Sequence, residues 1–89
     1  MDQTRRDGKT PQLRDFLSAK VTKRSVSIAG HLTSISIEQP FWDELVSIAE
    51  QGGISPSTLI ARIDKERETN LSSALRLYVL YHLKPRPSL

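Results

Sequence analysis

The chain has 89 residues, no cysteine and a formal net charge of +3. A chain of this length forms one small domain at most, and without cysteine it has no disulfide framework, thiolate metal site or thiol nucleophile. No apolar run approaches the roughly 20 residues that span a bilayer. We therefore expect a soluble cytoplasmic protein without a membrane partner, and the positive charge favours anionic partners.

The positive charge is concentrated near the N-terminus. Residues 1–30 hold seven Lys or Arg against three acidic residues, whereas residues 31–89 hold six against seven. We expect residues 1–22 to be a flexible basic arm, with one or two helical turns within 13–20, and residues 85–89 to be a short tail after a domain over 23–84. Basic arms often contact nucleic-acid phosphates, although a solubilising tail without a target has the same composition.

Residues 23–38 alternate between apolar and polar side chains and are rich in β-branched residues, which is typical of strands. Val26 and Ile28 are even-numbered, but Ile35 and Ile37 are odd-numbered, so one straight strand would place these pairs on opposite faces. A two-residue turn within 29–31 brings them to one face together with Thr33. The other face then carries Ser25, Ser27, Leu32, Ser34 and Ser36. In the alternative arrangement only the second half is a regular strand, and the first half is an extended arm.

Three helices follow. Apolar spacings of three and four predict a helix over 39–51, which Gly52-Gly53 ends. Ser55 is the expected N-cap of a second helix that begins at Pro56 and runs to about residue 68. Asn70 is the expected N-cap of a third helix over 71–83. This helix is apolar nearly all round, so we expect a second chain to enclose it.

These elements indicate a two-fold dimer. A single hairpin is not stable alone in water, and Ile35 and Ile37 need cover. In the arrangement we expect, the strand of each chain pairs antiparallel with its mate, and both apolar faces pack on four intertwined helices. If residues 23–28 also pair as an outer strand, the dimer presents four strands, which is too wide for a DNA groove of about 12 Å.

The strand at 33–37, the helix at 41–49, the Gly52-Gly53 turn and the segment 54–60 resemble the ribbon-helix-helix fold of Arc-type repressors. The chain is also similar to a group of uncharacterised bacterial ribbon-helix-helix proteins across residues 23–83, about two-thirds of its length. The segments that carry this likeness are Lys-Arg-Ser-Val-Ser-Ile-Ala-Gly-His at 23–31, Phe-Trp-Asp at 41–43 and Asn-Leu-Ser-Ser-Ala-Leu-Arg at 70–76. The resemblance implies a mainly α fold with a short β-ribbon, an intertwined homodimer and an extra C-terminal helix.

The resemblance also implies a DNA interface. In the Arc-type family a ribbon enters the major groove, and its outward side chains contact base edges; by position these are Leu32, Ser34 and Ser36. A leucine offers only apolar contact, for example with a thymine methyl, where relatives have a polar or basic residue. Ser55 and Ser57, at the start of the second helix, would hold a phosphate, and Lys23 and Arg24 would contact others. The same residues also fit a solvated strand face, an ordinary helix cap and exposed edge charges.

Nothing in the sequence indicates catalysis or a cofactor. It contains no glycine-rich phosphate loop and no nucleophile elbow. His31 and His82, the two histidines, are far apart in sequence, and no carboxylates cluster with them, so we expect no metal site. We therefore expect a small bacterial transcriptional regulator, a repressor that binds double-stranded DNA as a homodimer or a higher oligomer. The alternative is a protein-interaction module, an antitoxin-like or adaptor dimer with a protein partner.

Overall fold

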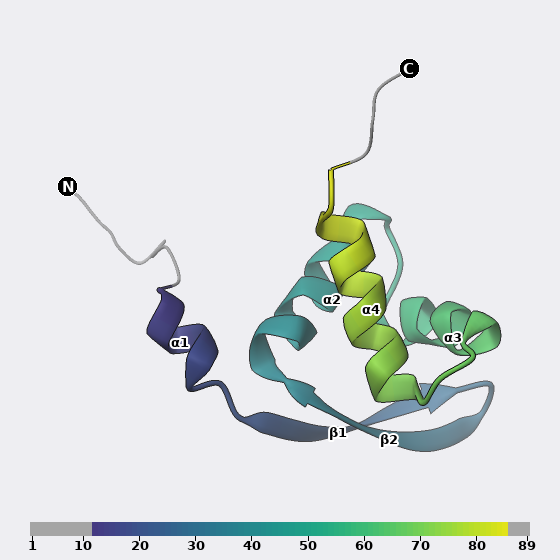
Figure 1. Ribbon diagram of the computed structural model, residues 1–89. Helices are drawn as coiled ribbons and strands as arrows, with labels where there is room; N and C mark the ends of the chain where they lie inside the picture. The colour runs from purple at the N-terminus through teal and green to yellow at the C-terminus, as the bar shows by residue number, and fades with distance from the viewer. Residues whose placement is uncertain (1–11, 86–89) are drawn as a thin grey trace.

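The computed structural model describes residues 12–85. A two-stranded ribbon lies beneath three helices that all cover the same face of it (Figure 1). In chain order the elements are α1 (Leu13–Leu17), β1 (Val21–Ile28), β2 (His31–Glu38), α2 (Gln39–Gln51), α3 (Pro56–Glu66) and α4 (Leu71–Leu83). The predicted class, mainly α with a short β-ribbon, is confirmed.

The ribbon is a hairpin within one chain. β1 and β2 pair antiparallel over eight residues each, from Val21 opposite Glu38 to Ile28 opposite His31. Ala29 and Gly30 form the turn with φ angles of 51° and 83°, the positive values that a type I′ turn requires and that match the twist of the strands. The predicted hairpin is therefore confirmed, and the first half of the segment is a regular strand rather than an extended arm.

The core lies between the ribbon and the helices. Val26, Ile28, Ile35 and Ile37 face the helices, where they join buried side chains from all three, including Leu45, Ile60 and Leu75. Ile35 and Ile37 are 1% and 0% exposed within the single chain. The expectation that these two isoleucines need a second chain for cover is wrong, because α2 and α4 contact β2 directly while α3 contacts β1.

The helix boundaries follow the capping signals. α2 and α4 span the predicted residues, and the Asn70 side chain accepts a hydrogen bond from the Ser73 N–H at the start of α4. α3 begins at Pro56 as predicted but ends at Glu66, two residues earlier than expected. The reason is Arg67, whose backbone is extended while its guanidinium bonds Asp64 Oδ1 and the Thr69 carbonyl.

α4 is enclosed on one side only. Leu71, Ala74, Leu75 and Val79 are buried in the chain's own core. The other side leaves four large apolar side chains more than half exposed, namely Leu77, Leu80, Tyr81 and Leu83. Within the single chain α4 is thus enclosed on one side, and enclosure of the remaining side by a second chain stays a prediction.

The expected segments at the two ends are described only in part. α1 confirms the short helix within 13–20; all five of its residues are exposed, and it lies beyond the start of β1, apart from the other helices (Figure 1). The basic residues Arg5 and Arg6 and most of the expected tail over 85–89 lie outside the described residues. Within residues 12–85, no helix is both long and apolar enough to cross a membrane.

Candidate nucleic-acid interface

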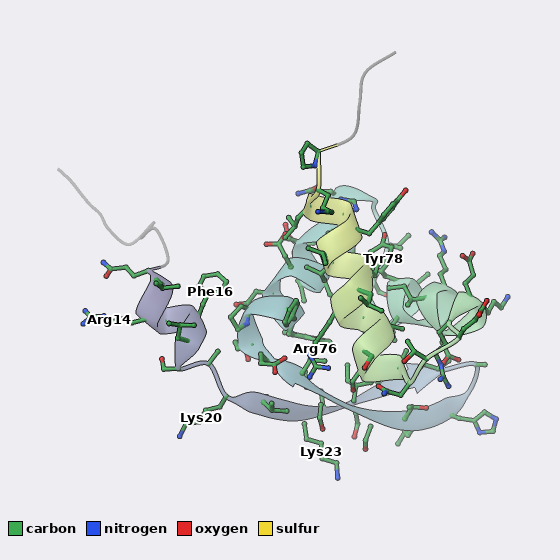
Figure 2. The ribbon with its side chains drawn as sticks, viewed as in Figure 1. Arg14, Phe16, Lys20, Lys23, Arg76 and Tyr78 are labelled. Atoms are coloured by element: carbon green, nitrogen blue, oxygen red, sulfur yellow. The ribbon has the colours of Figure 1, made fainter. Side chains whose placement is uncertain are left out.

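The ribbon has an outer face that points away from the helices. By the alternation of the strands it carries eight side chains. Val21 and Glu38 pair at the open end of the ribbon, and the other six are Lys23, Ser25 and Ser27 from β1 and Leu32, Ser34 and Ser36 from β2. They lie opposite one another in three cross-strand pairs: Lys23 with Ser36, Ser25 with Ser34, and Ser27 with Leu32. Figure 2 shows Lys23 pointing away from the helix layer. We call these six residues the outer ribbon face.

The outer ribbon face suits contact with a polar, anionic partner. Four of its side chains are serines, whose hydroxyls can donate and accept hydrogen bonds, and its one charged residue is a lysine. Leu32 is 81% exposed, the highest value among the exposed large apolar side chains of the described residues. A two-stranded ribbon also fits the major groove of B-DNA, which is about 12 Å wide. The predicted contacts Leu32, Ser34 and Ser36 are thus brought together on one surface.

Lys23 and Arg24 are neighbours in sequence but lie on opposite faces. Arg24 is on the helix side, where its guanidinium carbon lies 4.5 Å from the centre of the Trp42 ring and its Nη2 donates to Gln39 Oε1 at 2.6 Å. Gln39 in turn donates to Asp43 Oδ1 at 2.8 Å. The structure therefore does not bring Arg24 to the surface that carries Lys23, and it gives Arg24 a packing role between the ribbon and α2.

α4 closes the outer edge of β2 at Ser36. The Ser36 N–H donates to Ser72 Oγ at 3.2 Å, and Arg76 Nη2 lies 3.4 Å from the Ser36 carbonyl oxygen. Arg76 Nε also donates to Glu38 Oε1 at 2.9 Å, and Figure 2 shows Arg76 between α4 and the ribbon. The hydrogen bond from Arg76, followed by a backbone hydrogen bond, lowers the pKa of Glu38 from its ordinary value of 4.5.

The N-terminus of α3 lies in the helix layer and not on the outer ribbon face. The Ser55 hydroxyl accepts from the Thr58 N–H at 3.1 Å and donates to Thr58 Oγ1 at 2.9 Å, so it is a helix cap. Pro56 has no N–H, and the Leu59 N–H donates to the Ser55 carbonyl. In this described first turn, the Ser57 N–H is thus the group placed to bond an external acceptor such as a phosphate.

Two features of the structure, one on the outer ribbon face and one between two helices, were not predicted from the sequence. Ser25 and Ser27 were expected on the outer face but not as contacts, although they have the same side-chain parity as Lys23. The other feature is an open groove of about 840 Å³ between α3 and α4. Apolar side chains including Ile63, Leu77 and Tyr81 line this groove beside charged residues of α3.

Among the described residues, no group of three His, Asp or Glu side chains could hold a metal ion.

Comparison with known proteins supports the fold. The chain resembles the solved structure of an uncharacterized protein from Bordetella pertussis Tohama I, with a TM-score of 0.62 and 28% sequence identity over 81% of this chain and 68% of that one. No curated protein matches the chain.

The family model that describes a ribbon-helix-helix domain matches residues 21–83, from the first residue of β1 to the last of α4. Such domains are generally DNA-binding regulators, typically without enzymatic activity, and they generally bind DNA as dimers. With the match covering well over half of its residues, this chain belongs to the ribbon-helix-helix family.

Proposed function

We propose that the chain is a small bacterial transcriptional regulator, acting as a repressor in the cytoplasm, and that it reads the DNA major groove with the outer ribbon face. The observation that carries this proposal is the composition of that face: four serines, one lysine and an exposed leucine on a ribbon of groove width. The serine hydroxyls suit base edges, and Leu32 suits a thymine methyl.

Phosphate contacts would hold the ribbon in register without reading sequence. Lys23 is placed for such a contact beside the serines, and the first turn of α3, with Ser55 as its cap and the Ser57 N–H as the donor, is a second candidate. The basic residues of the N-terminal arm would add further contacts. Arg24 is left out of this set because it packs on Trp42.

We further propose that two copies of the chain associate, and that higher oligomers form on DNA. The exposed side of α4, with Leu77, Leu80, Tyr81 and Leu83, is the apolar surface that a second copy would cover. The same surface also favours the second candidate function, in which the chain is an antitoxin-like or adaptor module and this side of α4 binds another protein.

Selection of bound fragments from random duplex DNA by the purified full chain tests the function. We expect enrichment of a short inverted repeat, and an affinity that falls steeply between about 50 and 200 mM salt as counterions are released. A flat response to salt, or no binding at micromolar protein, would contradict DNA binding and favour the protein-interaction module.

Lys23 and Arg24 offer a matched pair for this test. Lys23→Ala should weaken binding to all duplexes alike and reduce the slope of log affinity against log salt by about 1, while stability stays unchanged. Arg24→Ala should instead lower the free energy of unfolding by about 1–2 kcal/mol, because it removes the contact with the Trp42 ring and the packing of the arginine stem. The folded Arg24→Ala protein should keep the wild-type salt slope, and a reduced slope would contradict its assignment to the helix side.

A further inference from the structure

We propose that α1 of one copy docks in the groove between α3 and α4 of a second copy, with Leu13, Phe16 and Leu17 as its anchors. This inference rests on the proposed association of two copies and is independent of DNA binding. It goes beyond that association because it gives α1 a role and names the occupant of the groove. In a two-fold dimer the contact is made twice, once in each direction.

The first observation is the apolar face of α1. Leu13, Phe16 and Leu17 have the i, i+3, i+4 spacing that places side chains on one face of a helix. They are 73%, 52% and 77% exposed, and α1 makes no extensive contact with another described element. Figure 2 shows Arg14 and Phe16 leaving α1 on different sides. α1 thus has an apolar face that the described part of its own chain leaves largely uncovered.

The second observation is the groove, whose lining suits an amphipathic helix. Its volume is about 840 Å³, and Ile63 of α3 and Leu77 of α4 are among its apolar lining residues. Grooves that bind amphipathic helices receive anchors at i, i+3 and i+4, which is the spacing found in α1. Leu77 also belongs to the exposed side of α4. The groove is therefore continuous with the surface that the proposed dimer covers.

The third observation is that α1 is held away from the groove of its own chain. Residues 18–20 connect α1 to β1 and span at most about 11 Å. Val21, where β1 begins, lies opposite Glu38, next to the start of α2. Figure 1 shows α1 beyond this end of the ribbon, with α2 and α4 between it and α3. The two apolar surfaces of one chain therefore lie apart, and each meets its complement in a second copy.

The charges of α1 and of the groove are complementary. Arg14 borders the apolar face of α1, because it precedes the last anchor by three residues, and its guanidinium forms no hydrogen bond or ion pair within the described part of the chain. The groove is lined by Glu66 and Glu68 together with Arg62, while its other cation, Arg67, is paired with an acid of α3. Docking of α1 thus brings a cation to an edge that carries two carboxylates.

Line broadening between two copies in NMR tests the exchange. The chain has no cysteine, so Lys20→Cys places a single nitroxide next to α1. This variant, without ¹⁵N, is mixed with ¹⁵N-labelled wild type, so that only the second copy is observed. We expect the amide signals of Ile63 and Leu77 to lose most of their intensity. Lys84→Cys, at the end of α4, is the matched label that reports association through α4.

Phe16→Glu should release α1, because it places a charge at the central anchor. In the Lys20→Cys chain this second change should abolish the broadening of Ile63 and Leu77. Broadening of α4 by the label at Lys84→Cys should persist, and so should sedimentation as a dimer at micromolar concentrations, because α4 still holds the two copies together.

A charge exchange tests the complementarity. Arg14→Glu should weaken docking about two- to fivefold, the effect of one exposed ion pair, seen as a smaller loss of Leu77 intensity. Glu66→Arg and Glu68→Arg in the same chain should restore the loss. Equal broadening by all of these chains would contradict the contact between Arg14 and the groove.

The labels also separate this inference from the proposed association. Broadening of Leu77 by the label at position 84 and not by that at position 20 would overturn the exchange while the association stands. Broadening only within one chain, seen when the ¹⁵N-labelled Lys20→Cys chain is diluted in excess unlabelled wild type, would also overturn it. No broadening from either position, with a monomer in sedimentation, would overturn both.

Discussion

Ala29 has an unfavourable backbone conformation at the tip of the ribbon. Its φ angle of 51° lies in the left-handed region, which costs a residue with a Cβ atom roughly 1 kcal/mol and which asparagine and glycine adopt more readily. An Asn-Gly pair is also the preferred sequence for a type I′ turn.

Ala29→Asn should therefore raise the free energy of unfolding by about 0.5–1 kcal/mol, seen as a higher midpoint in urea with an unchanged slope. Ala29→Val is the matched control and should lower the midpoint, because a β-branched residue is strained at this φ. A lower midpoint for Ala29→Asn would contradict the turn geometry.

Glu38 gives the fold a dependence on acid. Because Arg76 lowers the pKa of Glu38 in the folded chain below its ordinary value of 4.5, the folded state binds the proton less readily than the unfolded state. The stability from this pair is fully present above pH 4.5, decreases as the pH falls below that value, and is lost below the lowered pKa.

Glu38→Gln should remove this contribution, so the difference in urea midpoint between wild type and variant should shrink as the pH falls from 6 towards 3. The double variant Glu38→Gln, Arg76→Gln should show the same pH profile as Glu38→Gln, because the titrating group is already absent. A constant difference across this pH range would contradict the effect of Arg76 on Glu38.

The faces of individual strand residues could be predicted from the sequence. The parity that places Val26 and Ile28 inward also places Arg24 inward, yet Arg24 was assigned with Lys23 to DNA on the strength of its charge. The contact partner could not be predicted in the same way, because Trp42 is 18 positions further along the chain and reaches Arg24 only through the packing of α2 on the ribbon.

At the scale of elements, local signals in the sequence were sufficient to predict most helix boundaries. The Gly52-Gly53 turn and the caps Ser55 and Asn70 mark the boundaries found in the structure, because each cap acts within its own first turn. The early end of α3 is different. The Arg67 side chain bonds both Asp64 and Thr69 where the helix ends, and the sequence contains no glycine or proline there that would predict this end.

The two N-caps offer a matched comparison. Ser55→Ala and Asn70→Ala each remove a side chain that accepts from a first-turn N–H, and each should cost about 1 kcal/mol of stability. If α3 holds a phosphate, only Ser55→Ala should also weaken DNA binding, by a similar factor for every duplex. The two affinities should be compared at temperatures where both variants have the same free energy of unfolding. Equal effects of both variants on affinity under these conditions would argue against a phosphate at α3.

At the scale of the whole molecule, the order of elements predicted that helices pack on one face of the ribbon. It did not predict whether those helices belong to the same chain or to a second chain. The apolar character of α4 predicted a second chain, whereas the structure uses one side of α4 to bury Ile35 and Ile37 within the same chain. Which side of an all-round apolar helix faces its own core depends on the path of the chain, and periodicity does not give that path.

The outer side of α4 is where we expect two copies to meet. Leu80→Glu places a charge on this surface, where Leu80 is 53% exposed, and should convert a wild-type dimer to a monomer in sedimentation at micromolar concentrations. The variant should keep the helical content of the wild type, and its urea midpoint should fall only by the amount that association adds to the wild-type stability. Leu17→Glu, on the exposed α1, is the matched control and should sediment as wild type does. A wild-type chain that is monomeric throughout this range would contradict association through α4.

The most direct test of the central claim is a titration of the ¹⁵N-labelled chain with duplex DNA, followed by NMR. We predict that the largest shift changes fall on the outer ribbon face, at Lys23, Ser25, Ser27, Leu32 and Ser34, with small changes along α4. Changes centred on Leu77 to Tyr81, or no changes at any salt concentration, would contradict a ribbon that reads DNA.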